Sequence, residues 1–488
     1  MLASGTSRAE ILALERAARA LEPGTSRRKA LRNAVAAAGE RFLRRIGTAK
    51  AWEEPAARAS ELLDLPVAER GVPLEQAIAL LEREVIAPGL NPASGGHLGY
   101  IPGGGIYHSS LADYLAAVTN KYASVFFVGP GAVRMENMLV RWTADLVGFG
   151  EGAGGAIHSG GSIANLSAVA TARDAHELKG ADYASSVVYL TTQAHHSVEK
   201  ALDLTGLREV QRHVVPMDNR HRMRPDALAR AIAEDRARGT RPWLIVAAAG
   251  TTDAGAVDPL DAIADVAQRE RCWLHVDAAY GGYFLLTEHG RAALAGIARA
   301  DSVVLDPHKG LFLPYGTGCL VARDGGALER AHALHAAYLP PRPPAEEWWD
   351  FSALSPELSR PFRGLAVWLP VKLLGAGAFR AALDEKLDLA AWAAREVAAI
   401  PGARVVAPPQ LSLLAFRHEL PGEDRAARDA RNREWLARTN ARQRVYLTAT
   451  ELPDGYALRI CVLSFRTHRD RMEMAVEDLR AALAELGG

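Results

Sequence analysis

The chain has 488 residues, of which 49% are hydrophobic and 23% charged, and its 57 basic residues balance its 57 acidic ones. This composition is that of a soluble globular protein, and the length suggests two or three domains. The balanced charge argues against a nucleic-acid-binding or membrane-surface protein, because both need a concentrated positive field.

Residues 1–90 carry a helical pattern and no strand pattern. Apolar residues recur at helical spacing over Ile11–Ala18 and again over Leu74–Leu81, with breaks at Pro23 and Pro55 between them. The first residues contain arginines and glutamates where a signal peptide needs an unbroken apolar run. The segment is either a small helical bundle of its own or an arm that packs on a partner subunit.

The centre of the chain alternates short apolar runs with helical stretches. Strands that are apolar on both faces and separated by helices indicate a mostly parallel sheet covered on two sides. The expected strands are Val187–Leu190, Trp243–Ala249, Cys272–Val276, Asp301–Leu305 and Cys319–Ala322, with helices over 198–206 and Leu260–Arg269. Active sites of such sheets lie at the carboxyl ends of the strands, in the turns that follow them.

From about residue 376 the pattern indicates a smaller α+β unit, in which helices and strands are mixed. Its expected elements are helices over 380–398 and 425–440 and strands over Leu411–Phe416, Val445–Thr448 and Ala457–Val462. The proline-rich stretch Leu339–Pro344 is expected to be a loop.

The cysteines favour a reducing compartment. They lie far apart and form no CxxC pair, so neither a disulfide framework nor a metal site is expected: Cys272, Cys319 and Cys461. The nearest candidate for a membrane span, Leu365–Ala378, is too short and contains Pro370 and Lys372. We therefore expect a cytoplasmic protein with no metal and no membrane partner.

The first chemical candidate is a lysine in the string DPHKG, residues 306–310, which follows the apolar run that ends at Leu305. Pro307 and Gly310 limit regular structure, so Lys309 is expected on a turn at a strand end. Taken alone, an exposed loop lysine is the commoner explanation.

The second candidate is Asp277, which directly follows an expected buried strand in the string HVDAAYGG. A buried, unpaired carboxylate is costly, so this aspartate needs a cationic partner unless it is exposed. A helix N-cap is the alternative, although Ala278 and Ala279 before two glycines make a poor helix start.

Two further strings complete the set. In HSGGSIAN, residues 158–165, two glycines and two serines open the helical stretch Ala164–Ala175, and their N–H groups and hydroxyls suit a phosphate. In TQAHHS, His195 follows a strand, where a lone histidine is more often structural than catalytic.

Together these parts are what a pyridoxal phosphate (PLP) site requires. A lysine forms a Schiff base with the aldehyde, and an aspartate keeps the pyridine nitrogen protonated so that the ring accepts electrons. The imidazole of His195 offers a face for the flat ring. The pyridinium would also be the cationic partner that a buried Asp277 needs.

At this point the sequence resembles the group II PLP-dependent amino-acid decarboxylases, which include aromatic-L-amino-acid and glutamate decarboxylases. The strings HVDAAYGG, DPHKG, SGGSIAN, QAHHS and AGTTDAGAVDPL follow the family's order and rough spacing. The resemblance begins near His97 and extends to RPFRGLAVWLPVKLLG, YLTAT and LRICV. Several motifs in order are more specific than any single one.

The resemblance implies the type I PLP-dependent transferase fold of the aspartate aminotransferase kind. It predicts a helical N-terminal segment over 1–90 that wraps a partner, a large PLP-binding α/β domain over 91–375 and a small C-terminal α+β domain over 376–488. Members are homodimers with the active site at the subunit interface, so a twofold dimer is expected.

Carried over residue by residue, the resemblance implies that Lys309 is the Schiff-base lysine, Asp277 pairs with the pyridine nitrogen and His195 stacks on the ring. The remaining contacts that it implies are with the phosphate, from Gly160, Gly161, Ser162 and His308, and with the ring or its edge, from Thr252 and Ala279.

The family also has a loop after the lysine, which carries a tyrosine that protonates the substrate carbon once carbon dioxide has left. Tyr338 stands at the matching place, beside the proline-rich stretch, and a positioned phenol can act as this general acid. Members that form aldehydes tend to lack the tyrosine, so Tyr338 favours plain decarboxylation to a primary amine. An exposed loop tyrosine is the alternative.

The substrate pocket is read from two segments. In the first, Tyr100 and Pro102 fit the pattern of aromatic-acid members, whereas Ile101 stands where phenylalanine is usual. In the second, which in relatives crosses the subunit boundary, Tyr122 offers an aromatic face and Ser124 replaces a bulky ring.

No arginine stands out in this pocket to receive an acidic side chain. We therefore expect an aromatic L-amino acid of the tyrosine, dopa, tryptophan or phenylalanine type, with an aliphatic one of the valine or leucine type as the alternative. Less favoured are an aldehyde-forming enzyme, a carbon–carbon lyase and a non-catalytic homologue, and the intact lysine, aspartate and histidine argue against the last.

Overall fold

The computed structural model describes residues 7–54, 60–65, 67–333 and 349–487. Contacts divide the chain into two units, Met1–Asn91 and Pro92–Gly488, and each is described separately.

The first unit is mainly helical, as predicted. Its helices are α1 (Arg8–Ala18), α2 (Thr25–Arg45), α3 (Ser60–Leu63) and α4 (Leu74–Leu81). The expectation that it contains no strand was wrong, because β1 (Trp52–Glu53) pairs antiparallel with β2 (Gly89–Leu90). Strands of two residues are too short to show an alternating pattern in the sequence.

The second unit contains a seven-stranded sheet in the order β3-β9-β8-β7-β6-β4-β5. Its strands are β3 (Gly154–His158), β4 (Ser186–Leu190), β5 (Gln211–Val214), β6 (Arg241–Ala248), β7 (Trp273–Asp277), β8 (Ser302–Leu305) and β9 (Gly318–Ala322). Neighbouring strands are parallel along the series β8, β7, β6, β4 and β5, whereas β9 runs antiparallel to both β3 and β8. The predicted, mostly parallel sheet is confirmed.

Two of these strands were not predicted. Edge strand β5 has the sequence QRHV and no buried residue, so hydrophobicity does not reveal it. Strand β3 begins with two glycines, which are weak strand formers.

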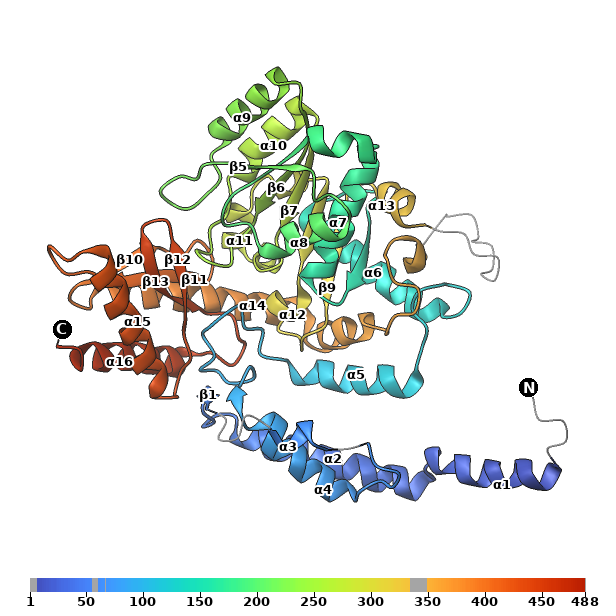
Figure 1. The fold of residues 1–488 in the computed structure, drawn as a ribbon. Coiled ribbons are helices and arrows are strands. Elements are labelled where there is room, and N and C mark those ends of the chain that lie inside the picture. Colours follow the sequence, from blue (N-terminus) through green and yellow to red (C-terminus); the bar gives the residue numbers. More distant parts are fainter. Residues whose placement is uncertain (1–6, 55–59, 66, 334–348, 488) are drawn as a thin grey trace. The chain divides into compact units, whose positions relative to one another are not determined.

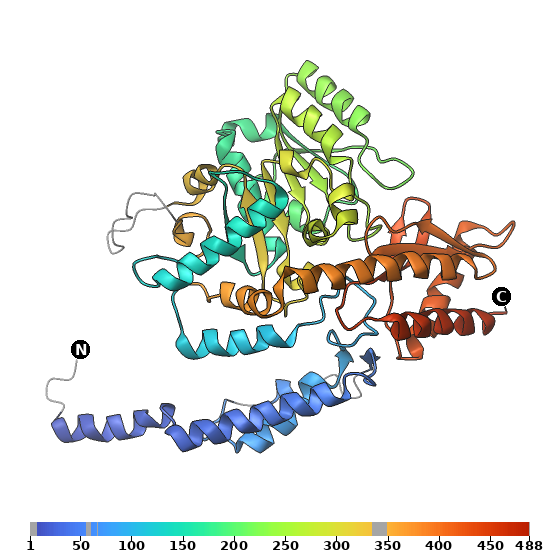
Figure 2. The ribbon, with the colours of Figure 1, turned by 180° about the vertical axis from the view of Figure 1, so that it is seen from behind.

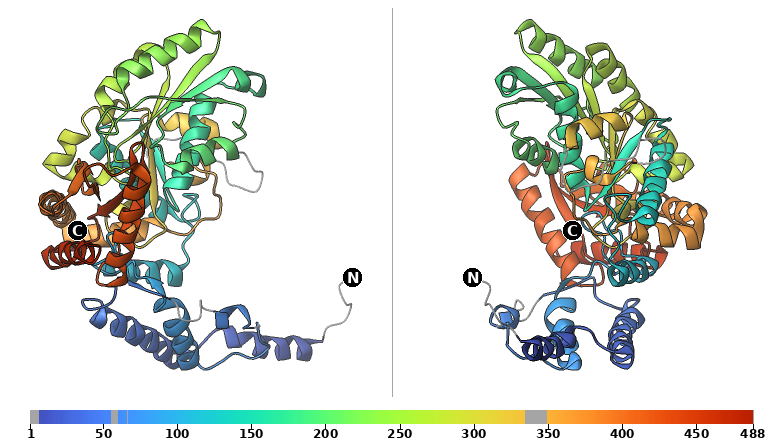
Figure 3. Two further views of the ribbon diagram at one scale, coloured as in Figure 1. Left: turned by 60° about the vertical axis from the view of Figure 1, so that its left-hand side comes forward. Right: turned by 90° about the vertical axis from the view of Figure 1, so that its right-hand side faces the viewer.

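Helices cover both faces of the sheet. Strands such as β4, β8 and β9 are therefore buried along their whole length. One face packs against α7 (Gly161–Ala175), α8 (His196–Leu204) and α13 (Gly325–His332) (Figure 1). The other packs against α6 (Pro130–Val147), α9 (Pro225–Ala237) and α10 (Leu260–Glu270) (Figure 2). The side views in Figure 3 show the sheet between these two layers.

The C-terminal part is the predicted small α+β unit. Its antiparallel sheet has the order β10-β11-β13-β12. The strands are β10 (Ala403–Ala407), β11 (Leu413–His418), β12 (Thr448–Leu452) and β13 (Gly455–Cys461), accompanied by α15 (Arg425–Ala441) and α16 (Arg469–Ala484). The strand expected over Val445–Thr448 instead begins at Thr448, and Tyr446 forms an isolated bridge with His97.

Helix α14 (Gly364–Ala398) connects the two sheets and contacts α5 (Tyr107–Thr119), α6 and α16. It is kinked at Gly375, where φ is 72° and ψ is 157°, and this kink falls at the expected domain boundary. Among the described residues it is the one helix long and apolar enough to cross a membrane by length and composition, a test that core helices also pass. The expected absence of a membrane partner stays a prediction.

Candidate active site

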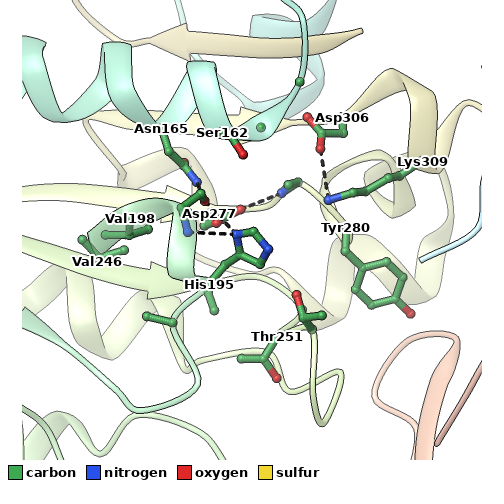
Figure 4. Close-up of a pocket in the computed structure, with 18 of the residues that line it drawn as sticks. Ser162, Asn165, His195, Val198, Val246, Thr251, Asp277, Tyr280, Asp306 and Lys309 are labelled. Atoms are coloured by element: carbon green, nitrogen blue, oxygen red, sulfur yellow. Dashed lines mark hydrogen bonds and ion pairs between the residues drawn. The ribbon is translucent and has the colours of Figure 1, made fainter. Parts of the chain in front are cut away.

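A pocket of about 260 Å³ lies at the carboxyl ends of the parallel strands. It brings together all nine residues that were predicted to hold the cofactor: Gly160, Gly161, Ser162, His195, Thr252, Asp277, Ala279, His308 and Lys309. They come from turns after five different strands, so the sheet, not local sequence, gathers them (Figure 4).

Lys309 lies on α12 (Pro307–Gly310), a single helical turn that follows β8. The predicted position on a turn at a strand end is confirmed, and the turn is helical because proline is well suited to the first position of a helix. The Lys309 Nζ is 3.0 Å from an oxygen of Asp306, whose side chain is buried. Burial alone would lower the pKa of Lys309, but the charges of Asp306 and Asp277 outweigh it and the pKa lies above its usual value.

Asp277 ends β7 with its carboxylate fixed by two donors. The backbone N–H of Ala279 donates to Oδ1 over 3.1 Å, and the side-chain amide of Asn165 donates to Oδ2 over 3.0 Å. The same amide nitrogen donates to Ser197 Oγ over 2.9 Å, so Asn165 joins the aspartate to the start of α8. Asp277 is therefore oriented before any ligand binds.

Behind Asn165 lies a buried chain of polar groups. Its Oδ1 is 3.0 Å from His275 Nε2, and His275 Nδ1 is 2.8 Å from Ser302 Oγ, which accepts from the indole of Trp273 over 2.9 Å. Burial lowers the pKa of His275 to about 4, although the charge of Asp277 opposes this. A neutral His275 that donates from Nε2 satisfies every member of the chain.

His195 is the N-cap of α8, and its Nδ1 accepts the backbone N–H of Ser197. Burial lowers the pKa of His195. A neutral imidazole that accepts at Nδ1 carries its proton on Nε2. The structural role and the chemical one are thus compatible, because one nitrogen caps the helix and the other is left for a ligand.

The turn formed by Gly160 and Gly161 (the glycine turn) packs closely against the residues around Lys309. A Cβ on Gly161 would lie 3.0 Å from Asp306 Oδ2 and 3.4 Å from the Ala279 side chain. A Cβ on Gly318, the first residue of β9, would lie 2.4 Å from the Gly160 backbone. These close approaches place the N-terminus of the 15-residue helix α7 beside Lys309.

His308 is fixed beside the same turn. Its Nδ1 contacts the carbonyl oxygen of Thr317, and its ring makes an edge contact with Tyr315 at 5.8 Å. Burial lowers the pKa of His308.

The five predicted substrate-pocket residues do not line this pocket: Tyr100, Ile101, Pro102, Tyr122 and Ser124. Tyr122 lines a second cavity, of about 610 Å³, and its hydroxyl donates to the carbonyl of Leu358 over 2.9 Å. Tyr338 lies outside the described residues.

The segment with Tyr100 nevertheless passes the lysine turn, since a Cβ on Gly103 would lie 2.0 Å from the carbonyl oxygen of His308. Tyr100 is stacked with Tyr446, with ring centroids 6.5 Å apart. An aromatic surface therefore stands near the pocket but outside it.

Sequence reasoning missed Asn165, Asp306 and Arg459. Asn165 and Asp306 stand inside the strings HSGGSIAN and DPHKG, but a string does not show which of its side chains contact residues from other strands. Arg459 is buried, donating to Tyr100 O and Thr448 Oγ1 over 3.0 Å each. Its Nε has no hydrogen-bond partner in the described part of the chain, although the charge of Asp253 acts on the guanidinium.

Comparison with known proteins now decides the family. Residues 58–419 match the model of the pyridoxal-dependent decarboxylase conserved domain. The chain belongs to this family. The predicted cofactor, PLP, and the predicted class, a PLP-dependent carboxy-lyase, are confirmed.

Relatives within the pyridoxal-dependent decarboxylases differ in substrate. The chain is 36% identical over 393 residues to an aromatic-L-amino-acid decarboxylase of Bacillus atrophaeus, covering 80% of this chain and 81% of the relative. It is 31% identical over 375 residues to the cysteine sulfinic acid decarboxylase of Homo sapiens, covering 75% of each. Family membership therefore establishes an amino-acid decarboxylase without establishing its amino acid.

The fold agrees with solved members of the family. The crystal structure of Oryza sativa TDC with PLP and tryptamine superposes with a TM-score of 0.89 at 24% identity, covering 95% of this chain and 99% of that one. The predicted PLP-dependent transferase architecture is confirmed.

Proposed function

We propose that this enzyme decarboxylates an aromatic L-amino acid to its primary amine. The observation that carries the proposal is the stack of Tyr100, on the segment that passes the lysine turn, with Tyr446 from the C-terminal unit. Offset aromatic faces favour an aromatic side chain. The 36% identity to an aromatic-L-amino-acid decarboxylase supports the same choice.

The residues in the pocket fit PLP. Lys309 supplies an amine, Asp277 supplies a fixed carboxylate, and the turn before α7 supplies free N–H groups at a positive helix end for the phosphate. When bound, PLP accepts the electron pair of the bond that carbon dioxide leaves.

Each residue then has one task. Lys309 would hold the cofactor's aldehyde carbon, and Asp277, oriented by Asn165, would keep a proton on the pyridine nitrogen. Gly160, Gly161 and Ser162 would hold the phosphate. His195 would stack on the ring, with its Nε2 proton available for proton transfer.

Tyr338 remains our proposed proton donor to that carbon after carbon dioxide leaves. It favours an amine over an aldehyde as product, because a general acid at the loop ends the reaction by protonation. The aliphatic and aldehyde-forming alternatives make different products and are separated by the same experiment.

The test is mass-spectrometric product analysis with purified protein, added PLP and a panel of amino acids that includes tyrosine, dopa, tryptophan, valine and glutamate. One aromatic amine as the dominant product is the expected result. A dominant aliphatic or acidic amine would overturn the aromatic assignment, and an aldehyde would overturn the role of Tyr338. Lys309→Ala should abolish turnover with every substrate.

We also propose that the working enzyme is a homodimer. Helix α5 exposes an apolar stripe with between 43% and 64% of each side chain accessible: Tyr107, Leu111, Tyr114, Leu115 and Val118. Phe127 and Val128, in a turn between α5 and α6, are also exposed. Such a patch favours a partner surface, and a second copy would bring Tyr122 toward the neighbouring pocket, whereas Ser124 is buried within its own chain.

Analytical ultracentrifugation should give twice the chain mass. Leu115→Lys together with Val118→Asp should yield a folded monomer with little activity. A wild-type monomer with full activity would contradict this proposal.

A further inference from the structure

Lys309 has two carboxylates within reach of its charge, but only one contacts it. Asp306 Oδ2 is 3.0 Å from the Nζ atom, whereas Asp277 acts on it without a direct contact. The contacting pair joins residues on one helical turn, and the Asp306 side chain is only 2% exposed. An ion pair shielded in this way is stronger than one at the surface.

The second oxygen of Asp306 is left without a partner. Oδ1 is buried and has no hydrogen bond in the described part of the chain. Both oxygens face the glycine turn, because a Cβ on Gly161 would lie 3.0 Å from Oδ2 and 3.3 Å from Oδ1. Lys309 is thus the principal counter-charge for an otherwise costly carboxylate.

We propose that Asp306 is a latch on Lys309, which holds its side chain as a paired ammonium and thereby limits the rate at which the protein captures PLP covalently. The inference rests on the assignment of Lys309 as the lysine that joins the cofactor. It adds that Asp306, the ion-pair partner of Lys309, controls the rate of PLP capture as well as the position of the lysine side chain.

The chemistry of the covalent step explains why a paired ammonium would slow the capture of PLP. An ammonium has no free electron pair, so Lys309 must first lose a proton to solvent. Its neutral nitrogen then adds to the aldehyde carbon, a carbon–nitrogen double bond forms, the carbon–oxygen bond breaks, and the aldehyde oxygen leaves as water together with the two remaining amine protons. No electrons are gained or lost overall.

The pH dependence of capture follows from the charges around Lys309. Asp306 from its own turn and Asp277 from β7 favour the ammonium, and Cys461 from β13 does so when ionised. His195 at the start of α8, His308 and Tyr315 also sense the lysine's charge. Removing the nearest carboxylate should therefore let Lys309 lose its proton at lower pH.

The experiment compares wild type with Asp306→Asn after the cofactor has been removed from both. Stopped-flow absorbance follows capture of PLP and of pyridoxal, which lacks the phosphate, across a range of pH. A third probe is the PLP analogue that carries a methyl group in place of the aldehyde, and its affinity is measured by quenching of protein fluorescence.

Asp306→Asn should capture both aldehydes faster at neutral pH, by a factor on the order of tenfold. Its rate should also reach a plateau at lower pH than that of wild type. The affinity for the methyl analogue should change by less than about twofold, since that analogue does not use the lysine.

Asp301→Asn is the matched control, because Asp301 immediately precedes β8 at the end opposite to Asp306. It should capture both aldehydes at the wild-type rate. Thermal unfolding of both variants checks that the fold is intact.

An unchanged or slower capture by folded Asp306→Asn would overturn the latch. The latch would also be overturned if Asp306→Asn improved binding only of PLP and its methyl analogue, the two probes that carry a phosphate. Asp306 would then act on the phosphate instead. Wild-type protein that captures neither aldehyde would overturn the assignment of Lys309 itself, and the latch with it.

Discussion

The side-chain amide of Asn165 donates to Asp277 over 3.0 Å and to Ser197 over 2.9 Å, so one residue orients both the carboxylate and the helix start that carries His195. Its carbonyl oxygen is taken by His275. Both the nitrogen and the oxygen of the Asn165 side chain therefore have partners in a single orientation of the amide.

Asn165→Ala should weaken PLP binding by roughly ten- to a hundredfold, because a hydrogen bond to a charged group contributes about 1.5–3 kcal/mol. Equilibrium dialysis or the cofactor's absorbance measures the affinity. The control is Asn432→Ala, which removes a buried asparagine that bonds His418 in the C-terminal unit. Equal losses of affinity in both variants would contradict a specific role for Asn165.

Buried histidines make the fold sensitive to mild acid. His158 has no hydrogen-bond partner among the described residues, and burial, together with the charge of Arg360, lowers its pKa to about 3. Between pH 6.5 and about 3 the unfolded chain therefore binds a proton that the folded one does not. This contribution leaves stability unchanged above pH 6.5 and lowers it as the pH falls.

His158→Leu should remove about 1.4 kcal/mol per pH unit from the slope of unfolding free energy against pH in this window. Urea unfolding at several pH values measures the slope. The exposed His289 provides the control through His289→Leu. A slope equal to wild type in His158→Leu would refute the assigned neutral state.

Gly318 sets the spacing between the glycine turn and the lysine. Gly318→Ala should lower PLP affinity on the order of tenfold, because overpacking costs about 1–3 kcal/mol and the added methyl meets Gly160 and Asp306. In Gly131→Ala, on α6, the new Cβ meets no atom within 4 Å. That control should bind PLP like wild type, whereas unaltered affinity in Gly318→Ala would count against the packing argument.

Arg459 is a candidate partner for the substrate carboxylate, because it is a buried cation beside the Tyr100 segment whose Nε has no hydrogen-bond partner among the described residues. Arg459→Met should raise KM roughly ten- to a hundredfold. The inhibition constant of the amine product should stay unchanged, since the amine has lost the carboxylate. If both constants rise together, Arg459 shapes the pocket and does not read the carboxylate.

Much of the cofactor site could be predicted from sequence, since strings such as DPHKG and HVDAAYGG place Lys309 and Asp277 at strand ends. What could not be predicted depends on contacts between distant strands. The chain order does not reveal that the side chain of Asp306 points at Lys309, or that Asn165 reaches Asp277. The roles of the site residues, the wrapping of a partner by residues 1–90 and the cytoplasmic location stay predictions.

The substrate wall was the weakest part of the sequence analysis. Tyr100, Ile101 and Pro102 were placed in the pocket by resemblance, yet they lie on a segment that passes beside it. In the proposed dimer, pocket walls supplied by a second chain would not be found from periodicity, because no single chain would bury them.

The position of β9 has a consequence for biosynthesis. Strand β3 leads into the glycine turn. Among the described strands β9 is its one partner in the sheet, and β9 begins nine residues after Lys309. A growing chain on the ribosome thus cannot anchor the turn until residues 318–322 have emerged. Loading with the cofactor is therefore an event that follows nearly two thirds of translation, when the lysine, the aspartate and the turn become neighbours together.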